Sequence, residues 1–119
     1  MAQALNQLLP PPEGKKRIVL AVGTAPTRLL CDALTAADPG MLIHGADPQV
    51  QAWADAAGVQ ALSMPRAGFS EARHAGAMLR VASLLGGVVV AFPGGEGTAD
   101  LVGKARGAGL VVVEVEKSS

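Results

Sequence analysis

A chain of 119 residues is long enough to bury the core of one domain, but not of two. Half of the residues are hydrophobic and only 3% are aromatic, so the core must be aliphatic, which suits helices packed on a parallel sheet. The 10 basic and 10 acidic residues give a formal net charge of zero, without the basic surplus that binding to a phosphate backbone requires. We therefore do not expect nucleic acid as the main partner.

The chain begins with residues 1–16, which we interpret as an N-terminal arm and linker to a single domain over residues 17–119. Residues 2–9 carry leucines at helical spacing, and the three prolines that follow favour an extended link. Such an arm packs either on the domain or on a partner subunit. A frayed terminus is the alternative interpretation.

From Arg17 onward, short apolar runs alternate with runs of helical periodicity, which indicates buried strands and helices in turn. Strands are expected at 18–22, 41–44, 59–64, 87–92 and 110–115, and helices at 27–37, 48–57, 70–84 and 98–108. Strict alternation predicts right-handed crossovers and an α/β fold. We expect a Rossmann-like, three-layer arrangement with five parallel strands in the order 3-2-1-4-5.

In that order the sheet reverses direction between its first and fourth strands, and ligands bind outside the carboxyl ends of the strands at such a reversal. Two loops flank this point, at 23–28 and 93–98. The first makes Gly23, Thr24 and Arg28 ligand-binding candidates. The guanidinium of Arg28 suits a phosphate, although an exposed helix residue is the alternative.

The second loop is the main candidate site, because it is rich in glycine, follows the most apolar strand and opens a helix. Glycines allow close approach of a ligand, and the helix offers free N–H groups and the positive end of its dipole. This pattern predicts a phosphate site, with a ligand-free tight turn as the alternative. Thr98 either caps the helix or donates to a phosphate oxygen, and Asp100 is a further candidate or a helix-stabilising acid. The loop reads Pro93-Gly94-Gly95-Glu96-Gly97-Thr98, which is neither a Walker A loop nor a dinucleotide fingerprint.

This region resembles a known superfamily. Residues 90–102, followed by Ala105-Arg106 and Gly109, are similar to the C-terminal half of the YspA-like branch of the SLOG superfamily, which also includes the LOG phosphoribohydrolases and the DprA/Smf proteins. Residues 43–47, followed by Trp53-Ala54, resemble an upstream segment of that branch. The resemblance spans roughly residues 18–115. It implies a nucleotide-like ligand and makes His44, Gly45 and Arg73 ligand-binding candidates. A structural histidine and a solvated helix residue are the respective alternatives for His44 and Arg73.

The sequence also departs from the pattern. In LOG enzymes the glycine motif continues to a Glu implicated in cleaving the N-glycosidic bond, and the matching position here is Leu101, which cannot act as acid or base. Asp100 lies about 100° away around a helix. The usual glycine-rich insert after the His-Gly pair is shortened, and the Arg-Asn pair of the family appears as Arg73-His74.

Other kinds of site find little support in the sequence. The single cysteine, Cys31, cannot form an intrachain disulfide, which fits a reducing compartment. The two histidines show no metal-ligand spacing, and no nucleophile-elbow pattern occurs. No apolar run approaches the roughly 18 residues of a membrane helix, and no signal peptide is evident. We expect a cytoplasmic protein without membrane association, metal or cofactor.

We therefore expect non-catalytic binding of a nucleotide or an ADP-ribose-like ligand, by a sensor or a sequestering protein. A LOG-like nucleoside 5′-monophosphate phosphoribohydrolase is one alternative, and an assembly protein that kept only the fold is another. LOG-type proteins pair through helices beside the site, and helix 70–84 has more apolar residues than one core-facing stripe needs. This predicts a homodimer or a higher even-numbered assembly. The residues concerned are Ala72, Ala75, Gly76, Ala77, Leu79, Val81, Ala82 and Leu84.

Overall fold

The computed structural model describes residues 17–65, 68, 70–94 and 98–115, so the expected N-terminal arm lies outside the described residues. Strands and helices alternate throughout, as the sequence predicts. They are β1 (Ile18–Val22), α1 (Thr27–Ala37), β2 (Met41–His44), α2 (Pro48–Ala57), β3 (Gln60–Ser63), α3 (Glu71–Leu84), β4 (Val88–Ala91), α4 (Thr98–Gly107) and β5 (Val111–Glu114).

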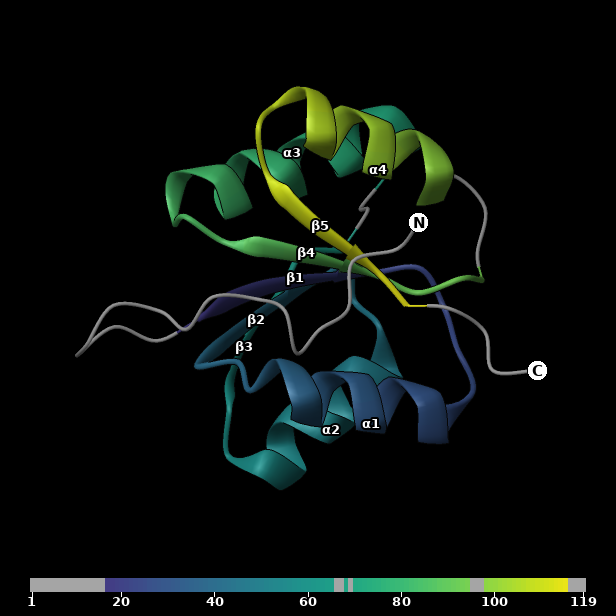
Figure 1. Cartoon of the computed structure of the whole chain (residues 1–119), viewed down its shortest axis with the longest axis vertical. Coiled ribbons are helices and arrows are strands. Elements are labelled where there is room, and N and C mark those ends of the chain that lie inside the picture. The colour runs from purple at the N-terminus through teal and green to yellow at the C-terminus, as the bar shows by residue number, and fades with distance from the viewer. Residues whose placement is uncertain (1–16, 66–67, 69, 95–97, 116–119) are drawn as a thin grey trace.

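The five strands form one parallel sheet in the order β3-β2-β1-β4-β5, which confirms the predicted fold class and strand order. Helices α1 and α2 cover one face of the sheet, and α3 and α4 cover the other (Figure 1). The central pair is β1 and β4, aligned from Val19 opposite Val88 to Val22 opposite Ala91. The strand order therefore reverses between these two strands, at the carboxyl edge where we expect the ligand.

Each strand supplies side chains to both helical layers, because successive residues of a strand point to opposite faces. In β1, Leu20 and Val22 pack with α3 and α4, whereas Val19 and Ala21 pack with α1 and α2. Both layers are aliphatic, as the composition predicts, and Phe92 is the one fully buried aromatic side chain in the described part of the chain.

The ends of the elements follow local hydrogen bonding. Helices α1 and α2 have the predicted bounds, and Ser70 caps α3 as its sequence suggests. Three strands begin later than predicted, since Val59, Gly87 and Leu110 each donate a backbone hydrogen bond to the helix before them. These residues therefore close the helix rather than extend the strand. None of the helices in the described residues is long and apolar enough to span a membrane.

Candidate functional site

Two loops meet at the carboxyl ends of β1 and β4. Thr24 and Gly94 exchange a pair of backbone hydrogen bonds, each 2.9 Å long, which form an isolated antiparallel bridge. Gly23 has a φ of +81°, and a Cβ at this position would overlap the carbonyl oxygen of Phe92. A Cβ on Gly94 would lie 2.5 Å from Oγ1 of Thr24. Glycine at these two positions therefore allows the loops to approach closely enough to pair.

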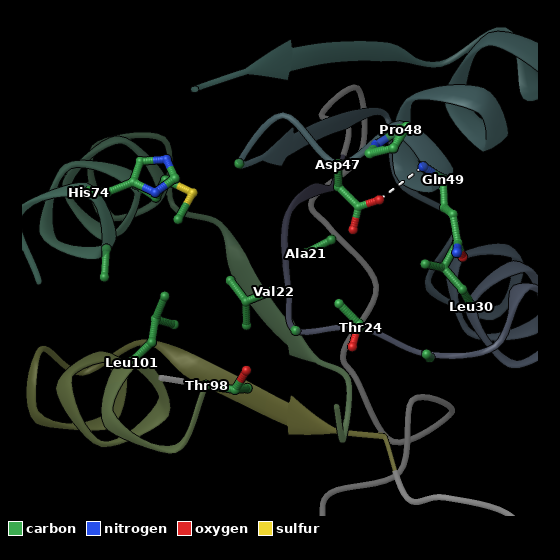
Figure 2. Close-up of a pocket in the computed structure, with 15 residues that line it drawn as sticks. Ala21, Val22, Thr24, Leu30, Asp47, Pro48, Gln49, His74, Thr98 and Leu101 are labelled. Carbon is green, nitrogen blue, oxygen red and sulfur yellow. Dashed lines mark hydrogen bonds between the residues drawn. The ribbon is translucent and has the colours of Figure 1, made fainter. Parts of the chain in front are cut away.

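A cavity of about 570 Å³ lies over this junction, within the size range of small-molecule sites. Figure 2 shows that it extends across the end of β1, from α4 and α3 on one side to α2 and α1 on the other. Its walls are mostly apolar, with polar groups at the beginnings of α2 and α4. It is lined by Ala21, Val22, Gly23, Thr24, Ala25, Leu30, Gly45, Asp47, Pro48, Gln49, His74, Ala75, Met78, Thr98 and Leu101.

At the α4 side, the first residue of the helix borders the cavity. The side chain of Thr98 is partly buried, and its hydroxyl donates a 3.3 Å hydrogen bond to the carbonyl oxygen of Gly94. Leu101 lines the cavity, whereas Asp100 is exposed and forms an ion pair of 3.1 Å with Lys104. The two neighbouring side chains thus face different directions, as helical geometry predicts.

The structure describes the two ends of the glycine-rich loop. Gly95, Glu96 and Gly97 lie outside the described residues. Of the described residues, Pro93 is exposed and Gly94 is partly buried, and neither lines the cavity. The described ends of the loop do border the site, because Gly94 is paired with cavity-lining Thr24 and the loop leads into Thr98.

At the α2 side, Asp47 caps the helix. Its Oδ1 accepts hydrogen bonds from the backbone N–H groups of Gln49, at 2.9 Å, and Val50, at 3.3 Å. Pro48 occupies the first turn, where its missing N–H costs nothing, as the sequence suggests. The loop from β2 reaches this cap through Ala46, which has a φ of +58°. This turn brings the carboxylate of Asp47 to the cavity wall.

The side chain of His44 supports that turn through a hydrogen bond and does not line the cavity. The side chain is 1% exposed, its Nδ1 accepts from the backbone N–H of Asp47 at 2.9 Å, and its Nε2 lies 3.0 Å from Oε1 of Gln51. Because Nδ1 is an acceptor, the ring proton sits on Nε2 and is donated to Gln51. Gln51 in turn donates to Asp55. Both nitrogens of His44 therefore bond to the protein, which is the structural alternative that we considered for this residue.

The two candidate arginines lie away from the cavity wall. Arg28 and Arg73 are both exposed, and neither lines the cavity. His74, for which the sequence suggests no partner, does line it and donates from Nε2 to the backbone carbonyl oxygen of Met64. Its ring packs so closely on Gly45 that a Cβ there would lie 2.9 Å from Cε1. The close packing of His74 therefore favours glycine at position 45, which also lines the cavity.

Sequence reasoning singled out Gly23, Thr24, Gly45 and Thr98 among the cavity residues, and it missed Asp47, Gln49 and His74 as wall residues. One signal pointed to Asp47, since an Asp-Pro pair after β2 marks a helix cap at the same sheet edge as the glycine-rich loop. No comparable signal marked His74, because its partner is a backbone carbonyl group. In the described part of the chain, no three His, Cys, Asp or Glu side chains gather closely enough to hold a metal ion.

No protein-family profile, curated protein or solved structure matches the chain significantly. The resemblance to the SLOG superfamily therefore rests on the motif residues of the sequence. Membership of that superfamily stays a prediction.

Proposed function

We propose that the cavity binds a nucleotide or a nucleotide-derived ligand without transforming it, with a phosphate of the ligand facing the glycine-rich loop and the beginning of α4. The observation that carries this proposal is the position of the cavity. It has the volume of a small-molecule site and lies where the strand order reverses, between the helical layers.

The first residue of α4, which lines the cavity, supports the proposed position of the phosphate. Thr98 contributes a hydroxyl group and the first turn of the helix, whose N–H groups and dipole favour an anion. The glycines at 94, 95 and 97 of the sequence permit the close backbone approach that phosphate binding requires.

The rest of the cavity suits the less polar part of a nucleotide. Leu30 and Ala25 come from the α1 side, and Met78 comes from α3. Apolar walls with a few polar groups are typical of sites that hold an aromatic ring system and fix its orientation. A polyanion without such a ring would leave these walls unused.

Binding without catalysis is supported by Leu101. This side chain lines the cavity at the position that matches the implicated Glu of the LOG enzymes, and it can neither donate nor accept a proton. Cleavage of an N-glycosidic bond depends on such an acid or base near the bond. A sensor or a sequestering protein has no need of one.

The test is a binding measurement with the full chain. Thermal shift and calorimetry would use the four ribonucleoside 5′-monophosphates, ADP-ribose and inorganic phosphate. We expect at least one nucleotide to bind, and Gly95→Val to weaken that binding roughly 10-fold or more, because the side chain would take the space of the anion. The matched control is Gly103→Val, since a Cβ at Gly103 meets nothing within 4 Å. Absence of binding, or unchanged affinity in Gly95→Val, would overturn the proposal.

Chromatography of the same mixtures tests the absence of catalysis. We expect no free base after incubation of the protein with the monophosphates. Release of base that disappears in Asp47→Asn would instead support the phosphoribohydrolase alternative, with the carboxylate on the cavity wall as its acid or base.

A further inference from the structure

The cavity differs in charge between its two sides. Among the described residues that line it, Asp47 is the one with a carboxylate, and no lysine or arginine faces it there. Figure 2 shows Asp47 and Gln49 on the α2 side, and Thr98 and Leu101 on the α4 side. A ligand that spans the cavity therefore meets a hydroxyl and a helix dipole at one end, and a negative charge at the other.

The two oxygens of Asp47 have different surroundings. Oδ1 accepts the hydrogen bonds of Gln49 and Val50, whereas no hydrogen bond to Oδ2 is found within the described residues. In Figure 2 this second oxygen is directed into the space between Asp47 and Thr24. The backbone of Asp47 is also fixed, because its N–H donates to buried His44. The carboxylate is thus held in place with one oxygen available to a ligand.

A carboxylate oxygen accepts hydrogen bonds and repels anions, so the group that it meets must be an uncharged or positive donor. In a nucleotide whose phosphate lies near Thr98, the hydroxyl groups of the ribose are donors between the phosphate and the base. Leu30 and Pro48 are apolar, lie on the same side of the cavity as Asp47 (Figure 2) and suit the face of a base.

We propose that Asp47 is a specificity-determining residue that accepts a hydrogen bond from a ribose hydroxyl group and so selects ribonucleotides over deoxyribonucleotides. This inference rests on the proposed function and adds the sugar to it. A polar site that bonds a hydroxyl rejects the analogue that lacks it, because the buried polar group is then left unpaired. The same charge disfavours ligands with a phosphate on that sugar edge.

Substitutions that keep the helix cap separate recognition from folding. Asparagine caps helices as well as aspartate does, but only its amide oxygen can accept from the N–H groups of Gln49 and Val50, so its NH₂ group turns toward the cavity and can still donate to a ribose hydroxyl group. Asp47→Ser keeps a capping oxygen and leaves no second polar group to face the cavity. Asp38→Asn is the matched control. Asp38 is exposed, follows the last residue of α1 and does not line the cavity, and its φ of +48° is one that asparagine tolerates.

The measurement is calorimetry of the full chain with the four ribonucleoside 5′-monophosphates and their 2′-deoxy and 3′-deoxy counterparts. For a base that binds, we expect the ribonucleotide to be preferred roughly 10-fold over at least one deoxy form. Asp47→Ser should lose most of this preference, whereas Asp47→Asn should keep part of it and Asp38→Asn all of it. If Asp47→Ser does not fold by circular dichroism, Asp47→Thr, which also keeps a capping hydroxyl group, should show the same loss.

The outcomes distinguish this inference from the function on which it rests. Equal affinity for the ribo and both deoxy forms, or a preference that a folded Asp47→Ser or Asp47→Thr leaves unchanged, would overturn the role of Asp47 while leaving nucleotide binding intact. A protein that binds none of the monophosphates would overturn both.

Discussion

At the scale of single residues, the site depends on backbone groups that approach more closely than side chains allow. Gly23 lies against the carbonyl group of Phe92, and Gly94 lies against Thr24. The bridge between Thr24 and Gly94 ties the loops after β1 and β4 together at the edge of the cavity. Both glycines are ligand-binding candidates from the sequence, and the structure shows that they also allow the two loops to approach each other.

The first prediction concerns Gly23. Gly23→Ala places a methyl group against the carbonyl of Phe92 in addition to straining a positive φ, whereas Gly58→Ala strains a similar φ in open space. We expect Gly58→Ala to lower the free energy of unfolding by about 1 kcal/mol, and Gly23→Ala to lower it by about 2 kcal/mol more. Urea denaturation of both variants measures the difference. Equal losses would show that the loops can separate at little cost.

At the scale of elements, most helix bounds were predictable because their signals are local. Pro48 after Asp47 fixed the beginning of α2, and Ser70 fixed that of α3. The beginnings of three strands were not predictable from apolar runs alone, since Val59, Gly87 and Leu110 bond back to a helix. Their side chains are compatible with a strand, and the competing hydrogen bond appears only when the helix is in place.

The second prediction concerns the beginning of α2. Asp47→Ala removes the acceptor for the N–H groups of Gln49 and Val50, and we expect the free energy of unfolding to fall by about 1 kcal/mol. Asp47→Asn keeps a capping oxygen and should change the free energy by only a few tenths of that loss. Urea denaturation of the two variants provides the check. A large loss in Asp47→Asn would show that the negative charge itself stabilises the helix.

In helix α3, the number of apolar residues does not by itself predict an interface, because several of these residues belong to the core. Ala75, Met78, Leu79 and Ala82 are buried in the core, and Ala75 also lines the cavity. The exposed side of α3 includes Arg73 and Arg80 as well as the small residues Gly76 and Ala77. Ala75→Glu would therefore bury a charge in the core rather than disrupt an interface.

At the scale of the whole molecule, the fold class and strand order were predictable, because strict alternation of strands and helices leaves few topologies. Which residues line the cavity was not predictable from the sequence. Asp47 and His74 come from different helical layers, so their meeting at one cavity depends on tertiary packing. His44 differs, because its ring is fixed by Asp47 and Gln51, which lie close to it in sequence.

The third prediction concerns assembly, and we propose a homodimer with α3 at the interface. Leu84 is 80% exposed and the adjoining Leu85 is 47% exposed, and exposed large apolar side chains that adjoin mark candidate contact surfaces. Light scattering should give twice the 12.0 kDa mass of the chain. Leu84→Glu should lower that mass to one chain, while Val111→Glu, an exposed position on β5, should not. A monomer mass for the parent protein at micromolar concentrations would refute the dimer.

We propose above that a nucleotide binds at the carboxyl edge of the sheet, with its phosphate toward α4. Titration of the ¹⁵N-labelled chain with the four ribonucleoside 5′-monophosphates, followed through backbone amide resonances, tests it most directly. We expect the amide resonances of Thr24, Gln49 and Thr98 to shift together with one dissociation constant, and those of Gly40 and Gly109, at the amino edge, to stay unchanged. Shifts confined to the amino edge, or no shifts at millimolar nucleotide, would contradict it.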